Sequence, residues 1–301
     1  MNNKIKIFIA TSSFNENPNN FIKKTVIKNF EFLKNPLKKK LTKQQLIKYA
    51  KDCDCIIAGT ENYDKDTINE LSKLKYLFRM GSGVDNVDID YLKKKKIKFS
   101  KSKVTPEIAV AELVIGYILS FYRNIHEHDR NLKNKIWNKK MGNVFNGKTL
   151  GIIGYGKIGK YIHKISKNFG IKILINDKKK INQKNTKLDI LLKNSDIITV
   201  NINHASKQKL LNRKKLNLCK KNCLIINTSR SEVIDNNYLY DLLKKNKILG
   251  VCLDVFEAEP YYGKFNKLKN VILTPHIGSY SSEIRSKMEQ EALQSVLLVK
   301  N

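Results

Sequence analysis

Apolar residues recur along the chain with two different spacings, and their alternation predicts an α/β protein. In the first hundred residues, short apolar runs of strand length alternate with stretches in which apolar residues follow helical spacing. This alternation is typical of a parallel sheet covered by helices. The strand-like runs are residues 4–10, 55–59, 74–80 and 97–100, and the helix-like stretches are residues 42–51 and 66–73.

A second α/β series follows a long predicted helix. Residues 104–123 are largely apolar, with Pro106 in the first turn, where a helix accepts proline. A length of 301 residues is enough for about two domains, so we expect a parallel sheet in each. The later strand-like runs are residues 148–154, 172–176, 197–202, 224–227, 249–253 and 271–273, and residues 281–299 form a last helix-like stretch.

The composition is that of a globular protein, with 41% hydrophobic residues. No segment approaches the ~18 consecutive apolar residues that a membrane helix needs, so we expect no membrane partner. The first residues read as a strand and lack the apolar core and cleavage site of a signal peptide. These features favour a cytoplasmic protein.

The formal charge of +31 admits a nucleic-acid partner as one interpretation. The lysines are spread along the whole chain, however, and arginine, which makes the bidentate contacts to bases and phosphates, is scarce. We therefore expect solvated surface lysines and no specific nucleic-acid partner. Weak, non-specific binding at low salt remains open.

The five cysteines predict free thiols and no metal site. They are odd in number, and no pair of Cys-x-x-Cys units or neighbouring histidines supplies a set of metal ligands. The cysteines are Cys53, Cys55, Cys219, Cys223 and Cys252.

A Gly-x-Gly-x-x-Gly pattern stands directly after the strand-like run 148–154 and opens a helix-like stretch. Its glycines are Gly154, Gly156 and Gly159. Glycines allow a sharp turn and a close approach of the backbone to a pyrophosphate, and the helix N-terminus favours the negative charge. The alternative is a tight strand-to-helix turn with no ligand.

An acidic residue supports the nucleotide interpretation. Asp177 ends the next strand-like run, 18 residues after Gly159, where dinucleotide-binding folds carry the acid that accepts hydrogen bonds from the adenosine ribose. A carboxylate there repels a 2′-phosphate. We therefore expect NAD as the cofactor in preference to NADP.

Three polar residues follow three later strands, at the edge where parallel sheets bind ligands. Arg230, Glu259 and His276 suit the reversible oxidation of a 2-hydroxy acid. The guanidinium can hold a carboxylate at two points, the imidazole can exchange the hydroxyl proton, and a carboxylate can orient the imidazole. Each residue alone could be a surface cation, a turn residue or a loop histidine.

With these residues in place, the chain resembles the D-2-hydroxyacid dehydrogenases, most closely their phosphoglycerate dehydrogenase branch, over about residues 55–290. The matching motifs are residues 79–88, 110–113, the Gly154 loop, 227–230, 254–260 and 274–278. The resemblance implies a Rossmann NAD-binding domain, residues 101–281, inserted into a flavodoxin-like substrate-binding domain, residues 1–100 completed by residues 282–301. It also implies a homodimer.

The resemblance assigns roles to individual residues. Arg230, Glu259 and His276 would be catalytic, and Ser82, Gly83, Val84 and Arg230 would bind the substrate. The expected NAD contacts are Ser82, Gly154, Gly156, Lys157, Ile158, Gly159, Asp177, Ile202, Thr228, Ser229, Asp254, Gly278 and Ser279.

The chain departs from the phosphoglycerate enzymes near the predicted substrate site. Those enzymes usually carry a phosphate-binding arginine in the loop after the strand 55–59, and this chain has Thr60, Glu61 and Asn62 there. A serine, Ser231, follows Arg230 in place of the usual glycine, and His204 is not the expected catalytic histidine.

We therefore predict an NAD-dependent oxidoreductase that interconverts a D-2-hydroxy acid and a 2-keto acid, including 3-phosphoglycerate and phosphohydroxypyruvate as candidates. One alternative is a hydroxypyruvate or glyoxylate reductase. Another is a non-catalytic module of the same fold that senses NAD. Formate dehydrogenases share the fold, but their relatives lack a glutamate at the position of Glu259.

Overall fold

The chain forms two compact units, which are described separately here. The computed structural model describes residues 4–81, 83–179, 181, 183–202, 209–297 and 299 of the 301-residue chain. Unit 1 comprises Met1–Thr105 and Ser281–Asn301, and unit 2 comprises Pro106–Tyr280. The sequence analysis placed these boundaries after residues 100 and 281.

Unit 1 is built on a parallel sheet with the strand order β2-β1-β3-β4-β5 in its described part. The register pairs Ile7 of β1 with Phe32 on one side and with Cys55 on the other. Because β1 lies inside the sheet and the chain winds to both sides of it, the order is that of flavodoxin-like folds. The strands are β1 (Ile5–Ile9), β2 (Phe30–Lys34), β3 (Cys55–Ala58), β4 (Tyr76–Arg79) and β5 (Lys98–Lys101).

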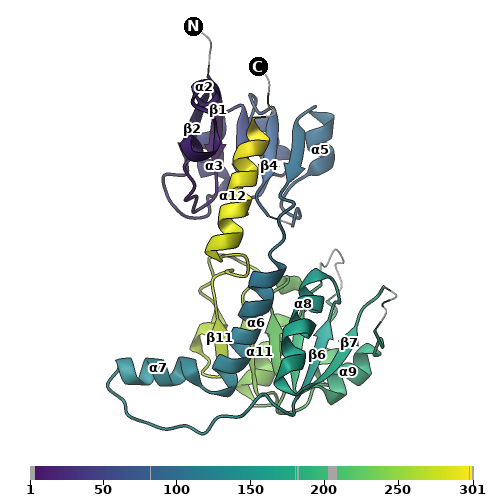
Figure 1. Ribbon diagram of the computed structural model, residues 1–301. Coiled ribbons are helices and arrows are strands. Elements are labelled where there is room, and N and C mark those ends of the chain that lie inside the picture. Colours follow the sequence, from purple (N-terminus) through teal and green to yellow (C-terminus); the bar gives the residue numbers. More distant parts are fainter. Residues whose placement is uncertain are drawn as a thin grey trace. The chain divides into compact units, whose positions relative to one another are not determined.

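Helices cover both faces of this sheet (Figure 1). Side chains of successive strand residues point to opposite faces, so Ile7 packs on the face covered by α12 and Phe8 packs on the other. Leu293 of α12 is fully buried against the first face. The helices are α1 (Pro18–Phe21), α2 (Lys24–Ile27), α3 (Lys43–Ala50), α4 (Lys65–Glu70), α5 (Ile89–Lys94) and α12 (Ser282–Val296).

Unit 2 contains a second parallel sheet, with the order β11-β10-β9-β8-β6-β7 in its described part. The chain passes from β6 to β7 on one side and then returns to β8 on the other side of β6. The strand order therefore reverses at β6 and β8, which is where open α/β sheets bind ligands. The strands are β6 (Thr149–Ile153), β7 (Lys172–Asn176), β8 (Ile197–Val200), β9 (Leu224–Asn227), β10 (Gly250–Leu253) and β11 (Val271–Leu273).

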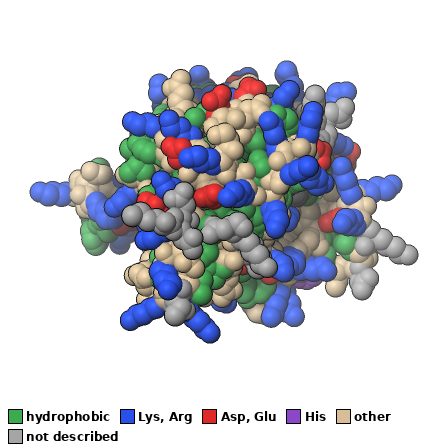
Figure 2. Space-filling model, turned by 90° about the horizontal axis from the view of Figure 1, so that it is seen from above, with side chains coloured by type: hydrophobic (Ala, Val, Ile, Leu, Met, Phe, Trp, Pro, Cys, Tyr) green, Lys and Arg blue, Asp and Glu red, His purple; other side chains and the backbone are tan. Residues whose placement is uncertain are grey.

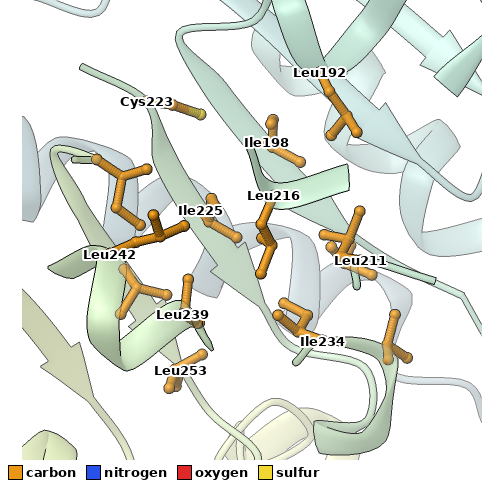
Figure 3. Packing of buried hydrophobic residues seen from close by; sticks show 14 of the residues in the cluster. Leu192, Ile198, Leu211, Leu216, Cys223, Ile225, Ile234, Leu239, Leu242 and Leu253 are labelled. Carbon is orange, nitrogen blue, oxygen red and sulfur yellow. The ribbon is translucent and has the colours of Figure 1, made fainter. Parts of the chain in front are cut away.

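Two apolar clusters hold the helices of unit 2 to its sheet. In one, Ile198 of β8 and Ile225 of β9 pack against Leu216, Leu239 and other apolar side chains of α10 and α11 (Figure 3). Each such buried side chain contributes about 1.5–3 kcal/mol. The helices are α6 (Glu107–Tyr122), α7 (Ile125–Lys133), α8 (Lys157–Ser166), α9 (Leu188–Asn194), α10 (Arg213–Leu216) and α11 (Asn236–Lys244), with 3-10 turns at Lys167–Phe169, Ser231–Val233 and Lys264–Lys267.

The predicted fold class, two parallel-sheet α/β domains, is confirmed. The long helix begins later than predicted, at Glu107, because Pro106 takes the N-cap position. The edge strand β2 was not predicted, since Glu31 and Lys34 interrupt its apolar residues and only Phe30 among its five residues is buried.

Lysine and arginine side chains spread across the face shown in Figure 2 rather than filling one area. Among the described residues, no single helix is long and apolar enough to cross a membrane, and α6 and α7 reach that length only as a pair bent by 66°.

Candidate functional site at the carboxyl edge of the unit 2 sheet

The glycine motif forms the turn from β6 into α8, and its three glycines have different surroundings. Gly154 has a φ of +90°, and a Cβ there would lie 2.7 Å from the carbonyl oxygen of Asn201. A Cβ on Gly159 would lie 2.1 Å from the carbonyl oxygen of Gly154. A Cβ on Gly156 would meet no atom within 4 Å. The protein's own packing therefore explains Gly154 and Gly159, but it does not explain Gly156.

The open space above Gly156 fits a bound pyrophosphate. Gly156 is the N-cap of α8 and makes no side-chain cap, and Lys157 and Ile158 form the first helical residues. The N-terminal amides of a helix need acceptors and favour an anion. A glycine that contacts no protein atom at such a place allows a phosphate to approach the backbone.

Asp177 lies directly after β7 and faces the same turn. Its Oδ2 accepts a hydrogen bond of 2.6 Å from the amide of Tyr155, and its Oδ1 accepts one of 2.8 Å from the amide of Lys179. Since a carboxylate accepts about four hydrogen bonds, both oxygens keep capacity for the hydroxyls of a ribose. The geometry fits the adenosine end of NAD.

The other predicted cofactor residues in unit 2 follow the carboxyl ends of successive strands. The Oγ1 of Thr228 is buried and has no hydrogen-bond partner among the described residues. The buried Asp254 accepts hydrogen bonds from the turn after β11. These residues are Ile202 after β8, Thr228 and Ser229 after β9, Asp254 after β10, and Gly278 and Ser279 after β11.

His276 and Glu259 form a pair at this edge. The Nδ1 of His276 lies 3.1 Å from Oε1 and 3.0 Å from Oε2 of Glu259, and Oε1 also accepts a hydrogen bond of 3.2 Å from the amide of Phe256. The two side chains are 39% and 23% exposed, so the pair is open to a ligand. A carboxylate on Nδ1 leaves Nε2 as the nitrogen that exchanges a proton with a ligand.

Arg230 ends the loop after β9 and is half-buried. Its Nη1 donates a hydrogen bond of 2.8 Å to the carbonyl oxygen of Ser229. The side chain of Asn227 holds this loop, because its Oδ1 accepts from the amide and the hydroxyl of Ser229 and its Nδ2 donates to the carbonyl of Arg230. The loop is therefore fixed at its base.

Asp254 organises the turn that carries His276. Its carboxylate accepts hydrogen bonds from the hydroxyl of Thr274 and from the amides of Ile277 and Gly278. Burial raises the pKa of Asp254 above its ordinary value, against the opposing effect of these hydrogen bonds and of His276. The sequence analysis missed Thr274 and its second partner, Tyr117 of α6. No pattern in the chain signals a contact between residues so far apart in sequence.

Of the predicted substrate residues, Arg230 belongs to unit 2, and the other three follow β4 in the sequence of unit 1. Gly83 and Val84 are half-buried there, whereas Ser82 and His204 lie outside the described residues. The loop after β3 carries Glu61 where the phosphoglycerate enzymes usually have an arginine. Glu61 is only 2% exposed and turns back so that its Oε2 accepts from the amide of Gly59 at 3.0 Å.

Glu61 belongs to a buried polar cluster with Arg79 and Asn86. The Nε of Arg79 donates to the Oδ1 of Asn86 at 3.1 Å, and the side-chain Nδ2 of Asn86 donates to the carbonyl oxygens of Gly59 and Glu61. Burial raises the pKa of Glu61, and the backbone hydrogen bonds and Arg79 oppose that rise. The cluster fixes the loop, and Thr60 and Asn62 are the side chains that it exposes.

Within the described residues, no group of three or more His, Cys, Asp or Glu side chains could hold a metal ion. The five cysteines are free thiols, as predicted.

Comparison with known proteins identifies the family. The model of the D-isomer-specific 2-hydroxyacid dehydrogenase NAD-binding domain matches residues 115–278, which lie in unit 2. A glyoxylate reductase of Thermococcus litoralis is 33% identical over 271 residues, covering 84% of this chain and 82% of that protein. A D-3-phosphoglycerate dehydrogenase of Methanocaldococcus jannaschii is 38% identical over 259 residues, covering 81% of this chain but 49% of that protein.

A solved structure agrees in fold over nearly the whole chain. The apo-structure of D-lactate dehydrogenase from Escherichia coli gives a TM-score of 0.82 at 26% identity, covering 97% of this chain and 96% of the other. The glycine turn, Asp177 and the open space at Gly156 fit the cofactor that the matched domain binds, which is NAD. The chain belongs to the D-isomer-specific 2-hydroxyacid dehydrogenase family.

Proposed function

We propose that the protein reduces a short 2-keto acid to the D-2-hydroxy acid, and catalyses the reverse oxidation, with His276 as the acid and base. The observation that carries this proposal is the contact between His276 Nδ1 and both carboxylate oxygens of Glu259, at 3.1 and 3.0 Å. It lies at the carboxyl edge of the sheet that also carries the glycine turn. When bound, NADH supplies the hydride.

Each of the three residues has a distinct role in this proposal. His276 gives a proton from Nε2 to the keto oxygen during reduction and takes it back during oxidation. Glu259 holds the imidazole by Nδ1 and stabilises its protonated form. Arg230 binds the substrate carboxylate through its guanidinium.

The cofactor residues would hold NAD without a metal or a covalent bond. Gly154, Gly156 and Gly159, with the amides of Lys157 and Ile158, would bind the pyrophosphate, and Asp177 would accept the ribose hydroxyls. Further contacts would come from Ser82, Ile202, Thr228, Ser229, Asp254, Gly278 and Ser279.

Glyoxylate and hydroxypyruvate are the substrates that the loop after β3 favours. Thr60 and Asn62 are its exposed side chains, and neither carries a charge that would attract a phosphate. Glu61 is buried and does not repel one. Phosphohydroxypyruvate is the second candidate, because the Methanocaldococcus jannaschii relative is a D-3-phosphoglycerate dehydrogenase.

Oxidation of NADH in the presence of glyoxylate, hydroxypyruvate, phosphohydroxypyruvate and longer 2-keto acids tests the proposal. We expect turnover, with a higher kcat/KM for one of the first two. A preference for phosphohydroxypyruvate would overturn the substrate assignment. NADH binding without turnover of any keto acid would favour a module that senses NAD.

We also propose a homodimer formed through α7 and the segment that follows it. None of the nine residues of α7 is buried, and Trp137 and Met141 are 81% and 94% exposed. Monomers rarely expose large contiguous apolar surfaces, and apolar side chains that gather on an exposed segment are typical of an interaction site. A second copy offers a matching apolar surface. The other large exposed apolar residues here are Ile125, Leu132, Ile136 and Val144.

Trp137 is the single tryptophan of the chain and therefore reports directly on this surface. We expect the mass in solution to be that of a dimer, and dilution to move the emission of Trp137 to longer wavelength. Trp137→Asp should give a monomer. A monomeric mass for the unaltered protein at micromolar concentration would refute the dimer.

A further inference from the structure

A chain of hydrogen bonds connects α6 to the turn that carries His276. Tyr117 of α6 is 3% exposed, and its hydroxyl contacts the Oγ1 of Thr274. The hydroxyl of Thr274 in turn contacts the Oδ1 of Asp254, which is 1% exposed. The two ends of this chain of contacts are buried, and Thr274 between them is half-buried.

The direction of these hydrogen bonds follows from their chemistry. Two backbone amides, of Ile277 and Gly278, already donate to Asp254 at 2.7 and 2.8 Å, so its carboxylate acts as the acceptor. Thr274 has one hydroxyl proton and must donate it to Asp254. Tyr117 therefore donates to Thr274.

Asp254 fixes the backbone on both sides of His276. It binds the side chain of Thr274 and the amides of Ile277 and Gly278, so residues 274–278 curve around a single carboxylate. His276 at the top of this curve has a φ of +55°. For a residue with a side chain, such a conformation persists only where the surroundings hold it.

We propose that Tyr117 is a positioning residue that acts on His276 through Thr274 and Asp254. By donating to Thr274, its hydroxyl fixes the orientation of the threonine hydroxyl toward Asp254 and keeps the turn in the form that places Nδ1 against Glu259. The proposal rests on the proposed function of His276, because it assigns Tyr117 a part in holding that side chain.

Four variants test this chain. Tyr117→Phe removes the first donor, and Thr274→Val removes the second while keeping the side-chain shape. Thr274→Ser keeps the hydroxyl. Tyr122→Phe is the matched control, since Tyr122 is a buried tyrosine of the same helix, 4% exposed, outside the chain of hydrogen bonds.

We expect Tyr117→Phe to lower kcat about fivefold and Thr274→Val about tenfold, as the loss of buried hydrogen bonds at the reacting group predicts. The KM for the keto acid and the affinity for NADH should change by less than about twofold. Thr274→Ser and Tyr122→Phe should match the unaltered protein. The double variant Tyr117→Phe/Thr274→Val should be no slower than Thr274→Val alone, because both act along one chain.

An NMR spectrum of the histidine rings gives a second readout, which does not depend on catalytic turnover. In protein labelled with ¹⁵N-histidine, the signals of His276 are identified by their loss in His276→Asn. Tyr117→Phe should shift them and leave those of His163 in place. If no keto acid were reduced but this shift were seen, the proposed function would fail and the chain of contacts would stand. Unchanged His276 signals in Tyr117→Phe, or kcat values equal to those of Tyr122→Phe, would overturn the proposal.

Discussion

Both sheets have charged residues at their carboxyl edges, but these residues are partly exposed in unit 2 and buried in unit 1. After β10 and β11 of unit 2, Glu259 and His276 form an exposed pair, at 23% and 39% exposure. In unit 1, Glu61 after β3 and Arg79 at the end of β4 are buried, at 2% and 9% exposure. The first edge leaves a histidine–carboxylate pair partly accessible, and the second leaves the neutral side chains of Thr60 and Asn62 exposed on a fixed loop.

Each unit also contains a buried carboxylate that holds a loop in place. Asp254 and Glu61 each follow a strand, each has a pKa raised by burial, and each accepts hydrogen bonds from backbone amides of its own edge. Both therefore hold loops in place. Glu259 differs from both, because its carboxylate is partly exposed and contacts the side chain of His276.

Replacing glutamate by glutamine in each unit should distinguish a role in the proposed reaction from a role in holding a loop. Glu259→Gln keeps an acceptor for His276 but removes the charge, so we expect kcat to fall about 10²-fold. Glu61→Gln should change kcat by less than about twofold. Steady-state oxidation of NADH measures both. An equal fall in kcat in the two variants would contradict a difference in role between Glu259 and Glu61.

The glycine turn provides a second comparison, within unit 2. Because a Cβ on Gly156 meets no protein atom, Gly156→Ala should keep the thermal stability and weaken NADH binding about tenfold. Gly159→Ala places a methyl group 2.1 Å from the carbonyl of Gly154 and should cost about 1–3 kcal/mol of stability. Titration of NADH fluorescence and thermal melts measure the two effects. Unchanged NADH affinity in Gly156→Ala would contradict the pyrophosphate site.

The smallest expected effect is the pH dependence that Glu61 gives to stability. Since burial raises its pKa above its ordinary value, the folded state binds more protons than the unfolded state between the ordinary pKa and the folded pKa. The free energy of unfolding should therefore fall as pH rises through this window. Glu61→Gln should flatten that part of the profile in urea unfolding. A profile with the same slope in both proteins would exclude Glu61 as the cause.

The candidate residues at the edge of unit 2 could be named from the sequence because their patterns are local. The glycine spacing and Asp177 follow from the turn that a pyrophosphate needs, and each candidate residue stands directly after an apolar run. The structure brings Glu259 and His276 together, as the resemblance implied.

The edge of unit 1 and the support of His276 could not be predicted in the same way. The inward turn of Glu61 depends on the amide of Gly59 and on Arg79, a residue of the neighbouring strand. The contact between Tyr117 and Thr274 joins residues 157 positions apart. Both contacts form only when distant parts of the chain pack together. Neither contact therefore corresponds to a spacing pattern in the sequence.

Replacement of His276 by asparagine tests the central claim most directly. His276→Asn removes the proton-transferring group at the exposed edge of unit 2. We predict that kcat with the preferred keto acid falls by about 10³-fold or more, while NADH binding, measured by fluorescence titration, stays within about twofold. A variant that binds NADH and reduces the keto acid at nearly the original rate would contradict the assignment of His276 as the acid and base.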